Sequence, residues 1–342
     1  MRKVAIILCN LGGPDSPAAV RPFLFNLFND AYVLALPQPF RALLAWIIST
    51  ARDKFARANY AKIGGRSPLF PETQKQAAAL EAALAGRRLA NLEAKTFIAM
   101  RHWRPFTADA AKAAASWGAT EAIVLPLYPQ FSGATTASAL AAWRKASRLP
   151  TAAVCCWSAG AKLARAHADA ILSAWRAAGS PGNPRVLFSA HGLPERDVAR
   201  GDPYQFHCER SVAAVRALLP ADWDHVLCYQ SRVGPLKWLG PSTDDEIRRA
   251  GADNRGLIVC PVAFVSEHIE TLVELDIDYA ELAHAQPLPF YIRAPAPGVA
   301  EPFIDALADL VEAALARPRQ TASDEGPRLC PHQFSRCPHR AA

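Results

Sequence analysis

Two sets of four apolar segments follow one another in the chain, and they match in their order and in the turns that follow them. The segments span residues 4–9, 96–100, 122–127 and 153–157, then 186–189, 225–229, 257–262 and 290–293. Alanine-rich stretches of helical length separate most of them. Because buried strands that alternate with helices are typical of parallel sheets, the chain is predicted to be an α/β protein. We expect two similar Rossmann-like lobes, each a four-stranded parallel sheet flanked by helices.

The turns after these segments support an internal duplication. Residues 8–14 (Leu-Cys-Asn-Leu-Gly-Gly-Pro) correspond to residues 188–194 (Phe-Ser-Ala-His-Gly-Leu-Pro), and residues 124–129 correspond to residues 259–264. Ligands of such sheets bind beyond the carboxyl ends of the strands, where these turns fall. The polar residues of the turns are therefore expected to line one cleft between the lobes.

The predicted domains are an N-terminal lobe over residues 1–160, a C-terminal lobe over residues 161–316 and a polar tail over residues 317–342. A chain of 342 residues with 51% hydrophobic and 20% charged residues is long enough for two globular domains. A formal charge of +7 favours acidic partners, such as a carboxylate-bearing substrate or an anionic membrane surface. The arginines are scattered and form no basic helix, so we expect no nucleic-acid partner. The sequence is silent on the oligomeric state.

The N-terminus leads directly into a strand-like segment with no signal peptide, so a cytoplasmic location is expected. The eight cysteines of a cytoplasmic chain are not expected to form disulfides. The most apolar stretch, residues 31–48, is interrupted by Pro37, Pro39 and Arg41 and is too short to span a bilayer. It is interpreted either as a core helix or as an apolar lip on the inner face of the cytoplasmic membrane.

A row of acidic residues follows the strand-like segment at residues 257–262. Glu270, Glu274 and Asp278 are four residues apart, and His268 precedes them. On a helix this spacing would place the three carboxylates on one face, where they repel one another. Such a ladder suits the movement of protons or divalent metal ions, although a solvated helix face would give the same pattern.

A second histidine, His191, ends the strand-like segment at residues 186–189, beside a glycine, and is expected to face the same cleft as the acids. The matching turn of the first lobe, residues 10–15, lacks the spacing of a nucleotide-binding loop. Aromatic residues, including Tyr128, add apolar surface with few charges. These features favour a site for a flat hydrophobic ligand and a metal.

Seven motifs, in order along the chain, resemble those of the ferrochelatases, which insert Fe(II) into a porphyrin at the end of haem synthesis. They lie at residues 11–14, 63–68, 125–130, 188–194, 201–204, 230–235 and 266–272. The resemblance extends over nearly the whole chain, to about residue 315. It implies two Rossmann-like lobes with a porphyrin cleft between them and Fe(II) as a substrate.

The resemblance also implies roles for individual residues. His191 and Glu270 would be the catalytic and metal-binding pair, with His268 beside them, and Glu274 and Asp278 would form an acid path leading from the porphyrin. The residues expected to contact the porphyrin or its propionates are Leu11, Arg52, Tyr60, Ser67, Arg101 and Tyr128. His102 stands where many relatives have tyrosine.

Four cysteines are candidates for a [2Fe–2S] cluster, which some ferrochelatases carry. They are Cys155, Cys156, Cys330 and Cys337. Relatives with a cluster usually supply three cysteines from the tail, whereas here His332 and His339 stand near the two tail cysteines. Cys155 and Cys156 are not expected to bind together, because consecutive strand residues point to opposite faces.

The sequence thus predicts a ferrochelatase that acts on protoporphyrin IX. Three alternatives stay open: a ferrochelatase for coproporphyrin III, a cobalt chelatase of the same superfamily, and a porphyrin or haem carrier without catalysis.

Overall fold

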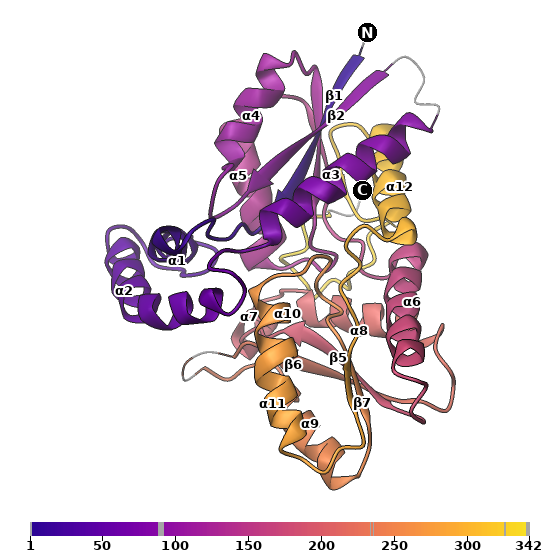
Figure 1. Cartoon of the computed structure of the whole chain (residues 1–342). Helices are drawn as coiled ribbons and strands as arrows, with labels where there is room; N and C mark the ends of the chain where they lie inside the picture. The colour runs from indigo at the N-terminus through magenta and orange to yellow at the C-terminus, as the bar shows by residue number, and fades with distance from the viewer. Residues whose placement is uncertain (1, 88–91, 233, 235, 325, 340–342) are drawn as a thin grey trace. The chain divides into compact units, whose positions relative to one another are not determined.

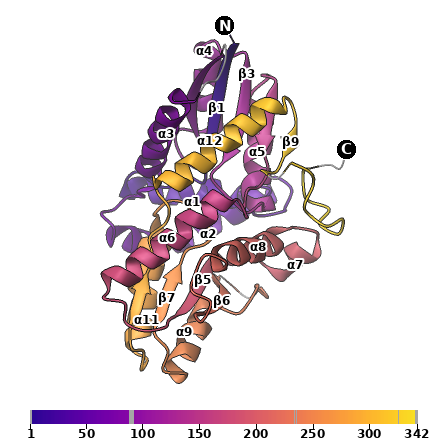
Figure 2. The ribbon, with the colours of Figure 1, turned by 90° about the vertical axis from the view of Figure 1, so that its right-hand side faces the viewer.

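The computed structural model describes residues 2–87, 92–232, 234, 236–324 and 326–339, and the chain divides into two compact units. Unit 1 comprises Met1–Cys156, Leu307–Leu329 and Pro338–Ala342. Unit 2 comprises Trp157–Ala306 and Cys330–Cys337. Each unit contains one parallel sheet with helices packed against both of its faces (Figure 1 and Figure 2).

Unit 1 is built around a sheet with the strand order β2-β1-β3-β4-β9. The apolar residues of β1 are buried on both faces, as expected for a central parallel strand. Helices α4 and α5 cover one face through an alanine-rich layer that includes Trp143. The elements of unit 1 are β1 (Arg2–Asn10), η1 (Pro17–Ala19), α1 (Val20–Phe28), α2 (Phe40–Ala61), α3 (Leu69–Ala85), β2 (Leu92–Met100), α4 (Thr107–Ser116), β3 (Glu121–Pro126), the π-helix η2 (Gly133–Ala137), α5 (Ser138–Ala146), β4 (Thr151–Val154) and β9 (Thr321–Ala322).

Unit 2 is built around a sheet with the strand order β6-β5-β7-β8. Helices α6 and α8 pack on one face, and α9 and α11 pack on the other. Helix α12 (Glu301–Ala316) begins in unit 2 and ends in unit 1. The other elements of unit 2 are α6 (Ala161–Ala177), β5 (Arg185–His191), α7 (Glu195–Ala199), α8 (Tyr204–Arg216), β6 (Asp224–Gln230), α9 (Thr243–Ala252), β7 (Leu257–Cys260), α10 (Ile269–Leu272), the π-helix η3 (Glu274–Asp278), α11 (Tyr279–His284) and β8 (Tyr291–Arg293).

The two sheets confirm the predicted duplication. The second strand, the first, the third and the fourth lie side by side in that order in both units. Equivalent backbone hydrogen bonds close the carboxyl ends of the two sheets: Leu127 N–H donates to the Cys9 carbonyl, and Val262 N–H donates to the Ser189 carbonyl, over 2.8 and 3.1 Å. In both units a π-helix follows the third strand of the repeat. The repeat therefore includes the loops that shape a site, as well as the strands.

The structure corrects the expected layout in two places. The sheet of unit 1 has a fifth strand, β9, which comes from the tail and pairs with β4. The tail is not a separate segment, because its residues 317–329 and 338–342 belong to unit 1 and its residues 330–337 belong to unit 2. A two-residue strand of ordinary polarity gives no periodic pattern, so the sequence carried no signal for it.

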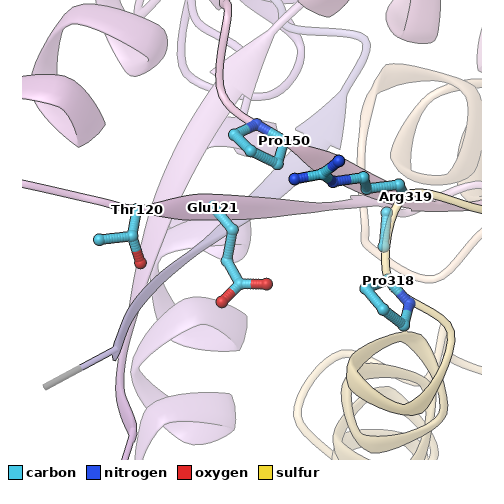
Figure 3. Close-up of a pocket in the computed structure, with 6 residues that line it drawn as sticks. Thr120, Glu121, Pro150, Pro318 and Arg319 are labelled. Atoms are coloured by element: carbon cyan, nitrogen blue, oxygen red, sulfur yellow. The ribbon is translucent and has the colours of Figure 1, made fainter.

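A cavity of about 410 Å³ lies at the amino ends of β3 and β4 in unit 1. Its lining includes Glu121 at the start of β3 and Pro150 just before β4, together with Arg319 of the tail (Figure 3). Glu121 is engaged there in an ion pair with Arg2. Ligands of parallel sheets bind at the carboxyl ends of the strands, so this cavity is not the candidate site.

Candidate active site

His191 is the last residue of β5, and its side chain is 42% exposed. Its Nδ1 lies 2.7 Å from the Gly192 carbonyl oxygen. Because a carbonyl only accepts hydrogen bonds, the proton of the neutral ring is on Nδ1, and Nε2 carries the lone pair. Nε2 in turn lies 3.6 Å from Oε1 of Glu270. The ring is thus oriented with a basic nitrogen towards a carboxylate.

The strand order of this sheet reverses between β5 and β7. The site lies at the carboxyl ends of these two strands. His191 ends β5, and Glu270 lies in the segment that follows β7. The loops that follow the two strands run in opposite directions. The crevice that opens between these loops is where such sheets bind ligands. The fold therefore brings together the two residues that the sequence singled out.

His268 holds the backbone of Glu270. Its Nδ1 accepts a hydrogen bond from the Glu270 N–H over 3.0 Å, which caps the short helix α10. The ring packs edge-on against Phe264. Burial lowers the pKa of His268, against the opposing charges of Glu270 and Glu267. A neutral ring with an occupied Nδ1 orients Glu270.

Glu274 is the most firmly held carboxylate of the site. It accepts hydrogen bonds from the backbone and hydroxyl of Ser231, from Gln230 Nε2 at 3.0 Å and from the Tyr279 hydroxyl at 3.2 Å. Burial and the charge of Glu270 raise its pKa, although the hydrogen bonds from Ser231 and Gln230 oppose this rise. A proton on Glu274 would therefore relieve the repulsion between its carboxylate and the charge of Glu270.

The expected ladder is only partly helical in the ordinary sense. Glu270 lies in α10, whereas Glu274 begins the π-helix η3 and Asp278 ends it. The Val273 carbonyl accepts from both Ile277 N–H at 3.0 Å and Asp278 N–H at 2.9 Å, which widens this turn. Asp278 is exposed. The acids therefore run from the half-buried Glu270, through the held Glu274, to solvent at Asp278.

Gln230 and Ser231 are the functional residues that sequence reasoning missed. The Gln230 side chain is fully buried and reaches both the Ser189 hydroxyl and the Glu270 carbonyl, at 2.7 and 2.9 Å. Ser231 has φ of 59°, a left-handed conformation that is costly for serine and that aims its N–H at Glu274. The two residues lay within one of the seven motifs, so their place at the end of β6 was the available signal.

In unit 1, four of the residues expected to contact the substrate, Leu11, Ser67, Arg101 and Tyr128, lie in the segments at the carboxyl end of the sheet. The Arg101 and His102 N–H groups bond to the carbonyls of Asn10 and Leu11, and Tyr128 follows the bond from Leu127 to Cys9. The Ser67 N–H bonds to the Pro14 carbonyl.

Gly13 brings two more of these residues together. A Cβ on Gly13 would lie 2.4 Å from Ser67 and 3.9 Å from the Tyr60 hydroxyl, so only glycine fits beside them. Tyr60 and Ser67 are both buried. Arg52 lies two turns earlier on α2 and is half-buried.

Arg101 is held by a buried carboxylate. It contacts Asp30 at 2.8 Å and the Ser138 hydroxyl at 2.6 Å. His102 is completely buried beside this pair, 3.9 Å from Asp30, and burial lowers its pKa to about 3. His102 is therefore neutral and part of the core.

The candidate cluster cysteines are all buried. Cys155 and Cys156 follow β4, with their Sγ atoms 3.7 Å apart. The expectation that they point to opposite faces was wrong, because both lie beyond the end of the strand. Cys330 lies 3.2 Å from Nε2 of His207, and the Cys337 N–H bonds to the Phe334 carbonyl. In the described part of the chain, no group of three or more His, Cys, Asp or Glu residues is arranged to hold a metal ion.

Solved structures with the same fold define the class of protein. An iron-bound SirB from Bacillus subtilis aligns with a TM-score of 0.52 at 13% identity, covering 93% of this chain and 97% of that structure. The structure of CbiX, described as the terminal enzyme of siroheme biosynthesis in denitrifying bacteria, aligns with a TM-score of 0.50 at 13% identity, covering 92% and 99%. The fold is that of the chelatases.

The sequence comparisons then give the family. The family model described as ferrochelatase matches residues 3–315. Ferrochelatases of Phenylobacterium zucineum and Caulobacter vibrioides are 56% and 52% identical to the chain, over 98% and 99% of its length and over 97% and 98% of theirs. The chain belongs to the ferrochelatase family, and the activity expected from the sequence, insertion of ferrous iron into a porphyrin, is confirmed.

Proposed function

We propose that the chain inserts Fe(II) into protoporphyrin IX and releases two protons, with His191 and Glu270 as the residues that act at the pyrrole nitrogens. The observation that carries this proposal is the placement of the His191 ring between the Gly192 carbonyl and the Glu270 carboxylate. Its Nδ1 is tied to the Gly192 carbonyl, which leaves the lone pair of Nε2 facing Glu270. A base poised in this way can accept a proton or bind an incoming metal ion.

The proton balance assigns a role to each acid. Iron replaces two N–H protons of the porphyrin, so the site must accept two protons for each turnover. His191 Nε2 takes one and becomes an imidazolium that the carboxylate of Glu270 stabilises at 3.6 Å. Glu270 takes the second. Glu274, with its raised pKa, receives a proton readily, and the exposed Asp278 passes it to solvent.

Unit 1 is proposed to grip the substrate. Tyr60, Ser67 and Arg101 supply hydroxyls and a guanidinium suited to propionates, while Leu11 and Tyr128 supply apolar contact. Binding at the rim can be used to bend the flat macrocycle and expose its nitrogen lone pairs. These contacts are a proposal, supported by the backbone bonds that join the segments of these residues at the carboxyl end of the sheet and by the place of Tyr60 and Ser67 beside Gly13.

Protoporphyrin is favoured over coproporphyrin by the charge balance of these residues. The charge of Arg101 is already matched by the buried Asp30. A substrate with four propionates would need more unmatched cations than one with two. The test measures kcat/KM anaerobically with Fe(II) and each porphyrin. A preference for coproporphyrin would reverse this assignment, and binding of one porphyrin per chain without turnover would indicate a carrier.

An interaction with a membrane surface is also proposed, through the apolar side chains of α2. Phe40, Leu43 and Trp46 are 64%, 59% and 51% exposed. A hollow of about 480 Å³ between α1 and α2 adds Arg21 and Arg57 beside Trp46, which suits anionic headgroups. No helix among the described residues is long and apolar enough to cross a membrane.

This interaction is tested by sedimentation with vesicles of phosphatidylglycerol or of phosphatidylcholine. The double substitution of Phe40→Ser and Leu43→Ser should reduce binding at least tenfold, because it removes the apolar anchor. Leu218→Ser, an exposed leucine of unit 2, is the matched control. Equal binding of all three proteins would contradict the proposed surface.

The [2Fe–2S] cluster expected from Cys155, Cys156, Cys330 and Cys337 stays a prediction. The described donors do not gather into such a site, and the proposed reaction does not require one. Iron and sulfide analysis of protein purified without oxygen, with its visible spectrum, tests the expectation. Cys330→Ser should abolish any signal.

A further inference from the structure

A single arginine, Arg293, connects the two ends of the segment that carries the proposed proton acceptors. Arg293 is the last residue of β8, and its side chain is 14% exposed. Its Nη1 donates to Oε1 of Glu267 over 2.5 Å. Its Nε and Nη2 donate to the two carboxylate oxygens of Asp276 over 2.6 and 2.7 Å.

The two acids lie on either side of the site residues. Glu267 directly precedes His268, and Asp276 lies in the middle of the π-helix that begins at Glu274. The guanidinium therefore fixes both ends of the stretch that contains His268, Glu270 and Glu274. The fork of Arg293 matches Asp276 with two parallel bonds, so it fixes direction as well as distance.

The anchor at Glu267 is itself well held. Its Oε1 also accepts the Ala296 N–H over 2.9 Å. Burial opposes the ionisation of Glu267, but the charge of Arg293 and the hydrogen bonds from Ala296 and Arg293 outweigh it and keep its pKa below the usual range. A charged Glu267 gives the guanidinium a permanent partner.

The anchor at Asp276 matters because of the local backbone. A π-helical turn is rare and is frequently found at functional sites. Asp276 is exposed on this turn, and Arg293 ties it to the neighbouring strand. If the turn relaxed to an ordinary helix, Glu274 would rotate relative to Glu270 and lose the donors of Ser231.

We infer that Arg293 is a positioning residue of the metal-insertion site, which sets the placement of Glu270 and Glu274 through Glu267 and Asp276. This inference rests on the proposed roles of His191 and Glu270. Arg293 does not touch the reacting atoms, so its loss acts on kcat rather than on porphyrin binding. A misplacement of about 1 Å at a reacting group costs on the order of 100-fold in rate.

Unit 2 offers a matched control in Arg185. Arg185, the first residue of β5, also bridges two carboxylates, Asp224 and Asp253, at 2.5 and 2.8 Å, and it is also poorly exposed. It lies at the amino end of the same sheet, away from His191. Arg293→Lys and Arg185→Lys each keep the charge and lose the fork, so they carry similar costs to the fold.

The experiment measures kcat and the porphyrin KM of both lysine variants and of Asp276→Asn, with the melting temperature of each. Arg293→Lys and Asp276→Asn should lower kcat by about 10- to 100-fold and change KM by less than about threefold. Arg185→Lys should keep kcat within about twofold. The combination of Arg293→Lys with Asp276→Asn should be no worse than Arg293→Lys alone, because the contact that Asp276→Asn weakens is one of the two that Arg293→Lys has already lost.

Two outcomes would overturn the inference: an unchanged kcat in folded Arg293→Lys, or an equal loss of kcat in Arg185→Lys at the same melting temperature. The variants His191→Ala and Glu270→Gln are measured in parallel. If these two keep full activity, the proposed function of the site is wrong. If they lose activity while Arg293→Lys does not, only the positioning role is wrong.

Discussion

The carboxyl ends of β1 and β5 are equivalent positions of a repeat, yet they carry different chemistry. Both strands have the same neighbours in their sheets, and both receive the same backbone bond from the third strand of the repeat. At the equivalent position of the two turns, unit 1 has Leu11, just after β1, and unit 2 has His191, the last residue of β5. One copy of the turn thus keeps an apolar surface, and the other has a base.

The two π-helices differ in the same way. The π-helix of unit 1, Gly133–Ala137, contains only small and hydroxyl residues, whereas that of unit 2, Glu274–Asp278, contains three acids. The shared backbone shows that a π-helix forms at this place in the repeat without the acids. The two copies of a duplicated scaffold can therefore have different roles, with apolar packing in one copy and proton chemistry in the other.

The largest effects are expected from substitutions in the two equivalent turns, at His191 and Leu11. His191→Ala should lower kcat by at least about 100-fold, because it removes the proposed proton acceptor. Leu11→Ala should raise the porphyrin KM by about tenfold and leave kcat nearly unchanged, because it removes apolar contact only. Steady-state kinetics under anaerobic conditions separate the two effects. Near-normal kcat in His191→Ala, with an unchanged melting temperature, would end the assignment of the base to unit 2.

A smaller effect is expected at the residue that holds Glu274. Ser231→Ala removes one hydroxyl donor from this carboxylate, at a cost of about 1 to 1.5 kcal/mol, or roughly tenfold in kcat. Because that hydrogen bond opposes the rise in the pKa of Glu274, its loss should raise this pKa further. The pH–rate profile of kcat should therefore shift to higher pH.

Ser211→Ala is the control for this prediction. Ser211 is also a buried serine of unit 2, but it lies on α8, where its hydroxyl bonds to the Ser158 and His207 carbonyls over 2.6 and 3.0 Å. The substitution should lower the melting temperature and leave the pH–rate profile in place. If Ser231→Ala left the profile unmoved as well, Glu274 would not take part in the titration that limits the rate.

The sequence predicted the parts of this comparison that depend on buried strands and on motifs. All eight strand-like segments were found, as was the place of His191 at the end of β5, because apolar runs and the turns after them are local signals. The pairing of His191 with Glu270 followed from topology and the resemblance. The π-helices were not predicted, because acids four residues apart suggest an ordinary helix.

The remaining misses share one physical reason. Arg293 is distant in sequence from Glu267 and Asp276, and Arg101 is distant in sequence from Asp30. No local spacing therefore marks these contacts. Ser231 owes its role to a positive φ, which serine seldom adopts. Such features are set by tertiary contacts, and a single sequence carries little trace of them.

Acid should destabilise the fold through the buried histidines of both units. Burial lowers the pKa of His102 in unit 1 to about 3, and those of His167 and His207 in unit 2 to about 4. Below the ordinary value of 6.5, the unfolded chain binds protons that the folded chain does not, so the free energy of unfolding falls as the pH falls. Each histidine contributes roughly 1.4 kcal/mol per pH unit until its folded pKa is reached.

Urea unfolding between pH 7.5 and 4.5 measures this slope. His167→Leu should reduce the slope by about 1.4 kcal/mol per unit, because the uncharged side chain no longer titrates. Above pH 7 the slope should be the same in both proteins. A variant with the parent's slope at low pH would show that His167 stays neutral in both states or is protonated in the fold.

The smallest effect sharpens the contrast between the π-helices. The side chain of Thr136 in η2 is completely buried, and its hydroxyl has no hydrogen-bond partner among the described residues. Thr136→Val replaces this hydroxyl by a methyl group of similar size, so it should stabilise the fold by up to about 1 kcal/mol. Activity should not change, because no residue of η2 is proposed to accept a proton. A loss of kcat would mean that the π-helix of unit 1 takes part in the chemistry, and that the division of work between the copies is less complete than the contrast of Leu11 and His191 indicates.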